Sequence, residues 1–222
     1  MKLSNETINV LKNFSTINQN LVIKEGSDIS TMSAMKNIVA KATVEEKFAK
    51  EFAIYDLNEF LSALSLFTNP NLDFNDDFVV MSEEGSNNKS LKYWYSDPSV
   101  VTSPSKEVTM PSSEVKFPLQ SNVLSEVQKA AAVIGVPDMV LEDSELRVTD
   151  KKNDTANSYS TSLDIKTEEN TPYKFWFKVE NLKLLPGCYD VEVSSKRISH
   201  FQNKKISVGY FIALEPESSY GN

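Results

Sequence analysis

The sequence predicts an α+β protein made of two similar domains, each containing helices and antiparallel strands. Three observations lead to this prediction. The chain of 222 residues is long enough for two ordinary domains. Its two halves match when one is shifted along the other, and a segment rich in Pro and Ser lies between them.

The internal duplication is the most informative feature. A shift of 117 residues, which places Lys12 on Lys129, aligns the early segments of the two halves. The later segments align after a longer loop in the second half. Two long copies are typical of tandem domains rather than of a solenoid. Matched pairs include Ile17 with Ile134, Phe52 with Phe175 and Asn58 with Asn181.

The boundary between the domains is predicted from composition. Residues 102–113 are rich in Pro and Ser and lack sustained periodicity, which is typical of an extended linker. We therefore expect an N-terminal domain over 1–108 and a C-terminal domain over 109–222.

A helix is predicted at the start of each half, over about 5–17 and 121–134, and Ser4 is a good N-cap for the first. In each helix the apolar side chains share one side, and the opposite stripe is polar with a single lysine. The apolar sides are Val10, Leu11, Phe14 and Ile17, and Leu124, Val127, Ala131 and Ile134. The polar stripes are Asn5, Asn9, Lys12 and Thr16, and Asn122, Glu126 and Lys129. One such stripe alone is typical of a solvated helix face; its recurrence favours a shared role.

A second, shorter helix is expected in each half. Asp56 is a good N-cap for the first of these, and Pro186-Gly187 would end the second, over 179–185. Strands are predicted where apolar and polar residues alternate, at 91–95, 173–179 and 206–212. Trp94 and Trp176 are expected to be core or sheet residues rather than platforms for base stacking.

The residues that carry most enzyme chemistry are scarce. The chain has one histidine, His200, one cysteine, Cys188, and six glycines that form no phosphate-binding motif. The acidic pairs lie among Asn, Ser and Gly, as in solvated turns. We therefore expect no enzyme activity, no metal and no cofactor.

Composition excludes several further classes. The net charge of −8 argues against a sequence-specific DNA-binding domain, because such domains gain most of their affinity by neutralising phosphates. No apolar stretch is long enough for a membrane helix, and the first residues lack a signal-peptide core. A single cysteine also suits a reducing compartment, so a cytoplasmic protein that binds no membrane is expected.

Four segments resemble one known family. Residues 1–18 and 53–66, together with Asp97-Pro98-Ser99 and Ala213-Leu214-Glu215, are similar to the sliding clamps of T-even-type bacteriophages. The resemblance runs from the first residue to the last and is more specific in the first half.

The resemblance implies a head-to-tail homotrimer that forms a ring, with helices lining the inner face and antiparallel sheets outside. Such a ring would enclose double-stranded DNA topologically and without sequence preference, and would tether the replicative DNA polymerase. It also implies an ATP-driven clamp loader, a role with late-transcription factors, and a location in the cytoplasm of an infected bacterium. An acidic outer surface agrees with this, since it would discourage DNA from binding outside the hole.

Two sets of site residues follow from the resemblance and the helix pattern. The residues expected to face DNA are Asn5, Asn9, Lys12, Asn122 and Lys129, with Lys2 and Lys183 as weaker candidates. The residues expected to dock a partner's apolar peptide are Val100, Val101, Pro104, Val108, Met110, Ile212, Leu214 and Pro216. The second set could instead seal the two domains together.

Two other functions are open from the sequence. Tandem β-rich domains with an acidic surface also suit a non-catalytic structural or assembly ring protein of a phage particle. An acidic DNA mimic would need carboxylates arrayed along one face, whereas here they are scattered over both halves. Stimulation of polymerase processivity that depends on a loader and ATP would separate these functions.

Overall fold

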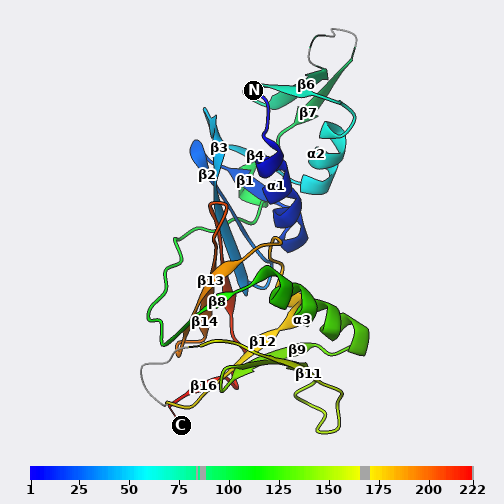
Figure 1. Ribbon diagram of the computed structural model, residues 1–222. Coiled ribbons are helices and arrows are strands. Elements are labelled where there is room, and N and C mark those ends of the chain that lie inside the picture. The colour runs from blue at the N-terminus through cyan, green and yellow to red at the C-terminus, as the bar shows by residue number, and fades with distance from the viewer. Residues whose placement is uncertain (84, 86–88, 166–170, 222) are drawn as a thin grey trace. The chain divides into compact units, whose positions relative to one another are not determined.

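A computed structural model describes residues 1–83, 85, 89–165 and 171–221 (Figure 1). The chain divides into two compact units, Met1–Glu107 and Val108–Asn222. This division falls within the segment 102–113 that composition marks as the linker. Each unit is described below by itself.

The described part of unit 1 contains two α-helices and two groups of antiparallel strands. The first sheet has the strand order β4-β1-β2-β3, and the second has the order β5-β6-β7. In chain order its elements are α1 (Asn5–Ile17), β1 (Leu21–Ile23), β2 (Gly26–Met32), β3 (Ile38–Phe48), β4 (Phe52–Ile54), α2 (Leu57–Leu64), β5 (Pro70–Phe74), β6 (Phe78–Glu83), β7 (Ser90–Trp94) and a 3-10 turn, η1 (Pro98–Val100).

Among its described residues, unit 2 contains one α-helix and two groups of antiparallel strands. Its sheets have the strand orders β11-β10-β9-β12-β16 and β15-β14-β13-β8. In chain order its elements are β8 (Val115–Leu119), α3 (Ser121–Ile134), β9 (Asp138–Glu142), β10 (Glu145–Thr149), β11 (Tyr159–Ser162), β12 (Tyr173–Lys178), a 3-10 turn, η2 (Val179–Asn181), β13 (Tyr189–Ser194), β14 (Ile198–Asn203), β15 (Val208–Ala213) and β16 (Ser219–Tyr220).

The two units repeat one topology. The order β3-β2-β1-β4 in unit 1 corresponds to β11-β10-β9-β12 in unit 2, and β5-β6-β7 corresponds to β13-β14-β15. In each unit a long helix precedes the first sheet, and a short helix or turn precedes the second. Unit 2 adds β8 beside β13 and β16 beside β12. The described topology therefore agrees with the duplication that the sequence predicts.

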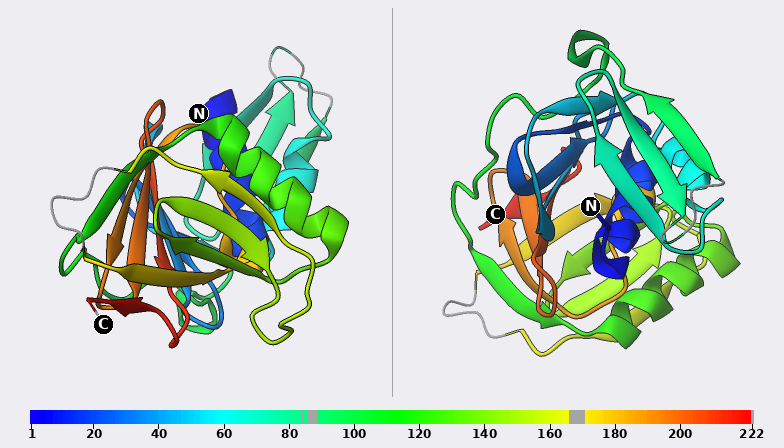
Figure 2. Two further views of the ribbon diagram at one scale, coloured as in Figure 1. Left: turned by 60° about the horizontal axis from the view of Figure 1, so that its bottom comes forward. Right: turned by 90° about the horizontal axis from the view of Figure 1, so that it is seen from above.

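The long helices cover their sheets through apolar side chains. In unit 1, Leu11 and Phe14 of α1 are fully buried, and β3 alternates buried and exposed residues along its length. In unit 2, α3 packs on β10 and β11 (Figure 2), where Leu146 and Val148 are buried. Because strand side chains alternate between faces, the other face of each sheet carries polar side chains.

The predicted helix over 179–185 is wrong, because the structure has only the single turn η2 there. The carbonyl oxygen of Leu182 accepts a hydrogen bond of 2.7 Å from the Gln128 side chain of α3, which fixes the chain in a non-helical path. Pro186 has no backbone N–H and also disfavours helical geometry at the residue before it. The other three predicted helices are present, and the predicted strands correspond to β7, β12 and β15.

A buried carboxylate joins strands of unit 2. Asp138, at the start of β9, is 1% exposed. Its Oδ1 lies 2.5 Å from Nζ of Lys178 on β12, and its Oδ2 accepts a hydrogen bond of 3.0 Å from the backbone N–H of Lys151. Lys151 in turn pairs with Glu215 and Glu217 near the C-terminus. This network ties the C-terminal segment to the sheet.

The strands that end the described sheets have a single described neighbour, and β7 in unit 1 and β11 in unit 2 are two of them. Within its own unit, β7 pairs with β6 among the described strands, and β11 pairs with β10. The N–H of Tyr95 donates a hydrogen bond to the carbonyl of Asp77 on the side of β6. Because backbone groups in an antiparallel strand point alternately to its two sides, those of Lys92 and Trp94 point away from β6. Likewise, Leu163 donates to Ser144, so the backbone of Ser160 points away from β10. Both edges therefore offer backbone donors and acceptors.

Candidate nucleic-acid interface

The first candidate surface is the exposed stripe of α1. Val10, Leu11, Phe14 and Ile17 are buried, as expected, and this orientation fixes the opposite side toward solvent. The exposed stripe contains Asn5, Asn9, Lys12 and Thr16, with Glu6 at its start. Neutral amides and one ammonium group can donate hydrogen bonds to phosphate oxygens without a high density of charge.

A buried carboxylate from β3 holds the beginning of α1. Ser4 caps the helix by accepting a hydrogen bond of 3.1 Å from the Thr7 N–H. Glu46 is 8% exposed and accepts short hydrogen bonds from the Ser4 N–H and the Thr7 hydroxyl. Burial would raise the pKa of Glu46, but these hydrogen bonds outweigh burial and lower that pKa below its ordinary value. Glu46 thus fixes the orientation of the α1 stripe.

Replacing Glu46 with glutamine is expected to destabilise unit 1 by about 1–3 kcal/mol at neutral pH, because an amide group cannot accept from both donors. The folded-state pKa is lowered, so the contribution of Glu46 is complete above its ordinary value of 4.5 and is lost as the pH falls below that value. Urea unfolding should therefore separate variant and wild type at pH 7 and bring them together in acid. Glu45→Gln, on the exposed face of β3, is the control, and an equal effect of both changes would contradict the role of Glu46.

The second candidate surface is the exposed stripe of α3. Leu124, Val127 and Ala131 are buried, whereas Ile134 is only half-buried at the end of the helix. The exposed residues Asn122, Glu126 and Lys129 form the stripe that the sequence predicts. Val133 is also 75% exposed, which the periodicity does not predict.

The shorter elements contribute little positive charge. Asp56 caps α2 by accepting from the N–H groups of Asn58 and Glu59, and the exposed face of α2 carries no described cation. Lys183 follows η2 and is half-buried, and Lys2 precedes α1 and is exposed. The exposed helix residues therefore include Lys12 and Lys129 beside the carboxylates of three glutamates, Glu6, Glu59 and Glu126. This nearly neutral surface suits weak, non-specific contact with a polyanion.

The candidate docking residues differ in accessibility. Val101, Ile212 and Leu214 are at most 8% exposed. Val100 is 60% exposed, and Pro216 is exposed. Pro104, Val108 and Met110 are half-buried. For all eight residues, docking stays a prediction.

Sequence reasoning placed Trp94 in the core or a sheet, and it lies on strand β7 with a side chain that is 62% exposed. Its ring lies 5.2 Å from that of Phe78, and Nζ of Lys92 lies 4.1 Å above the Phe78 ring. The alternation of residues in β7 could have indicated this exposure. Leu91 and Tyr93 point to one face of the strand, so Lys92 and Trp94 point to the other. This exposed group at a strand edge was not among the predicted site residues.

The described residues include no group of three or more His, Cys, Asp and Glu side chains placed to hold a metal ion. His200 is half-buried and stacks on Phe211 at 4.4 Å. Burial lowers the pKa of His200, against an opposing effect of Glu192. In the part of the chain that the structure describes, no helix has the length and apolarity to span a membrane.

Comparison with known proteins gives consistent matches. Residues 3–101 match the family model described as "DNA polymerase processivity factor". The chain is 37% identical to the sliding clamp of Vibrio phage KVP40, over 97% of this chain and 99% of that protein. It is 29% identical to the sliding clamp of Enterobacteria phage T4, over 99% of both chains.

Two solved structures share the fold at low sequence identity. The Proliferating Cellular Nuclear Antigen of Entamoeba histolytica superposes with a TM-score of 0.66 at 16% identity, and the match covers 94% of each chain. PCNA from Thermococcus kodakaraensis superposes with a TM-score of 0.69 at 15% identity, over 95% of this chain and 96% of that one. The predicted α+β architecture with helices and antiparallel sheets is therefore confirmed.

Proposed function

The chain belongs to the sliding clamps of T4-type bacteriophages, the DNA polymerase processivity factors, and we propose that three copies close into a ring around duplex DNA. The ring tethers the polymerase to its template and performs no catalysis itself. Its attachment to DNA is topological, so it needs neither a sequence-reading element nor a cofactor.

The observation that carries this proposal is the duplication of one topology with unlike free edges. Strand β7 of unit 1 and β11 of unit 2 each have one described neighbour and backbone groups that point outward. Pairing β11 of one copy with β7 of the next satisfies both edges and joins copies head to tail. Three chains of two units each then give six similar units around the ring.

The exposed stripes of α1 and α3 suit the inner surface of such a ring. The amides and single lysines of these stripes would contact phosphates, while Glu126 and Glu6 limit the total attraction. Tight phosphate binding would hinder sliding, because every neutralised phosphate adds affinity. A net charge of −8 for the whole chain does not conflict with this role, since closure of the ring holds the DNA.

Three further partners are part of the proposal. An ATP-driven loader would open and close the ring, since a closed ring cannot thread onto circular DNA. The polymerase and late-transcription factors would dock apolar peptides on the accessible candidates, Val100, Pro104, Val108, Met110 and Pro216. Each of these interactions would take place in the cytoplasm of the infected bacterium.

Solution mass and processivity test the proposal together. Light scattering of the purified chain should give three times the chain mass of 24.9 kDa. Because a ring dissociates by mass action when dilute, the mass should be measured over a range of concentrations. Addition of the clamp, a matching loader and ATP should lengthen the products of the phage polymerase on a primed circular template. A chain that stays monomeric at high concentration and leaves product length unchanged would refute the proposal.

Replacing Lys12 or Lys129 with glutamate is expected to lower the yield of rings loaded onto DNA roughly tenfold at a limiting clamp concentration. An exposed ion pair contributes about 0.5 kcal/mol, and all three copies lose it together while DNA enters the open ring. The yield can be measured as the number of clamps per nicked circle after loading at low salt. Lys47→Glu makes the same charge change on the face of β3 away from α1 and should leave the yield unaltered. Equal yields for all these variants would show that the helix lysines do not face DNA.

A further inference from the structure

The helix-free face of β7 carries a cation without a carboxylate partner. Lys92 and Trp94 both extend from this face, and Nζ of Lys92 lies over the rings of Phe78 and Trp94 at 4.1 and 5.3 Å. No ion pair joins Lys92 to a carboxylate among the described residues. The opposite face of β7 is the one that packs toward α2, where Tyr93 contacts Phe60. The described partners of this exposed lysine are therefore aromatic rings, and Lys92 has to leave the Phe78 ring on β6 to reach across the free edge of β7.

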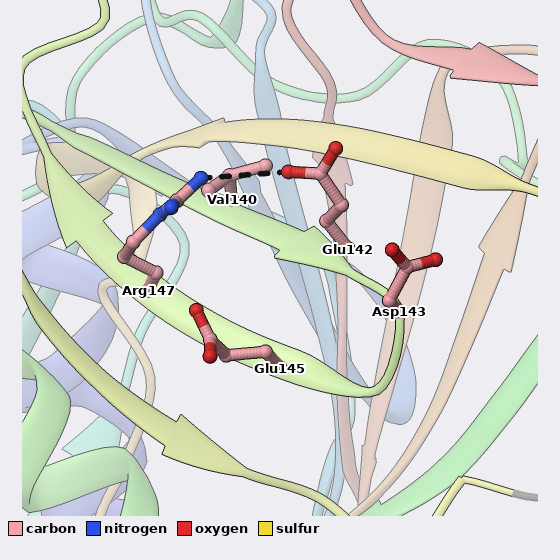
Figure 3. Close-up of a pocket in the computed structure, with 5 residues that line it drawn as sticks. All are labelled: Val140, Glu142, Asp143, Glu145 and Arg147. Carbon is pink, nitrogen blue, oxygen red and sulfur yellow. Dashed lines mark hydrogen bonds and ion pairs between the residues drawn. The ribbon is translucent and has the colours of Figure 1, made fainter.

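The corresponding face of unit 2 has an acidic hollow beside β11. A pocket of about 260 Å³ is lined by Val140, Glu142, Asp143, Glu145 and Arg147, and Figure 3 shows the three carboxylates around it. Glu142 already pairs with two cations, at 3.4 Å from Arg147 and 3.0 Å from Lys174. By contrast, no ion pair joins Glu145 or Asp143 to another described residue. Two carboxylates of the hollow are thus available to a further cation.

Small side chains separate this hollow from the edge of the sheet. Glu145 on β10 is opposite Ser162 on β11, and Arg147 is opposite Ser160. The side chains of Leu146 and Val148 point to the other face, under α3, so Glu145 and Arg147 share the helix-free face with these serines. A long side chain from a strand added beside β11 can therefore pass over the serines and reach Glu145. The distance from an added β7 across β11 to β10 is two strand spacings, or about 10 Å, which a lysine and a glutamate side chain can span together.

We propose that Lys92 of one copy enters the acidic hollow of the next copy and pairs with Glu145, while Trp94 covers Ser160 and Ser162. This inference rests on the proposed ring, in which β7 and β11 pair and the helices of all copies lie on the inner side. The occupant is a second copy of this chain, because the unpaired cation and the unpaired carboxylates lie at the two edges that the ring joins. Alternation of faces then places all five side chains on the outer surface of the ring.

Charge reversal tests the pair. Lys92→Glu and Glu145→Lys are each expected to raise the concentration at which trimers dissociate roughly tenfold, and the double variant should restore it to within about threefold. Analytical ultracentrifugation over a dilution series measures this concentration. Lys47→Glu is the control for net charge, and circular dichroism checks that each variant is folded. Since all of these side chains are at the surface, the folded units should be preserved.

The possible results distinguish failure of the Lys92–Glu145 pairing from failure of the proposed ring. Single variants whose trimers dissociate at the wild-type concentration, or a double variant that shows the sum of two losses, would overturn the pairing of Lys92 with Glu145 while leaving the ring in place. A wild-type chain without trimers would refute the proposed ring itself. A Trp94→Ser variant with wild-type dissociation would likewise remove Trp94 from the interface.

Discussion

Replacing Ser160 with proline is expected to abolish the ring at micromolar concentrations while unit 2 stays folded. The N–H of Leu163 donates to the carbonyl of Ser144, on the side of β10. Since backbone groups alternate along β11, the N–H of Ser160 points away from β10. Proline at this position therefore breaks no bond within the sheet, but it removes a donor and places its ring where β7 of the next copy would approach. One missing hydrogen bond, with its acceptor left buried, weakens association roughly a hundredfold.

The measurement is again solution mass, combined with product length in the processivity assay. The variant should have the mass of a single chain, 24.9 kDa, and should no longer lengthen products. Ser160→Ala keeps the backbone N–H and serves as the matched control, which should assemble as the wild type does. A proline variant that still forms trimers would mean that copies join through another surface.

Replacing Lys178 with methionine is expected to cost about 3 kcal/mol of stability in unit 2. Methionine retains most of the apolar stem but leaves the carboxylate of Asp138, 1% exposed, without its cation at 2.5 Å. Removing one partner of a buried pair is much more costly than the pair itself is favourable, because the remaining charge cannot recover its hydration. Urea unfolding followed by fluorescence of Trp176, on the same strand, measures the loss.

An exposed pair provides the comparison for this variant. Nζ of Lys204 lies 3.0 Å from Oδ1 of Asp190, and the two side chains are 47% and 62% exposed. Lys204→Met should therefore cost less than about 1 kcal/mol. Equal losses from the two substitutions would show that burial of Asp138 does not determine the energy of the pair.

Much of the fold could be predicted from the sequence because its signals are local. The cap at Ser4 and the spacing of Leu11, Phe14 and Ile17 determine the position and orientation of α1. Gly135, with a φ of 69°, ends α3 in a left-handed conformation that suits glycine. The duplication predicts the second unit from the first, and the structure repeats the strand order accordingly.

The parts that could not be predicted depend on contacts between distant residues. The η2 turn was predicted as a helix, because nothing local shows that the Gln128 side chain binds the Leu182 carbonyl. The burial of Ile212 and Leu214, two of the predicted docking residues, also depends on tertiary packing, since apolar side chains near a strand end look alike in sequence whether buried or exposed. The exposed Trp94 depends on which face of β7 the sheet covers, which is a tertiary property.

The unlike edges of β7 and β11 have a consequence for direction. In the proposed ring, copies that join through two different strands can follow one another in only one sense, so the ring would have rotational symmetry but no two-fold axis in its plane. Its two sides therefore present different loops to the solvent. A protein that docks on one side of the ring is therefore always in front of the ring or always behind it during movement along DNA. The orientation in which the ring is loaded is kept for as long as the ring stays closed on the template.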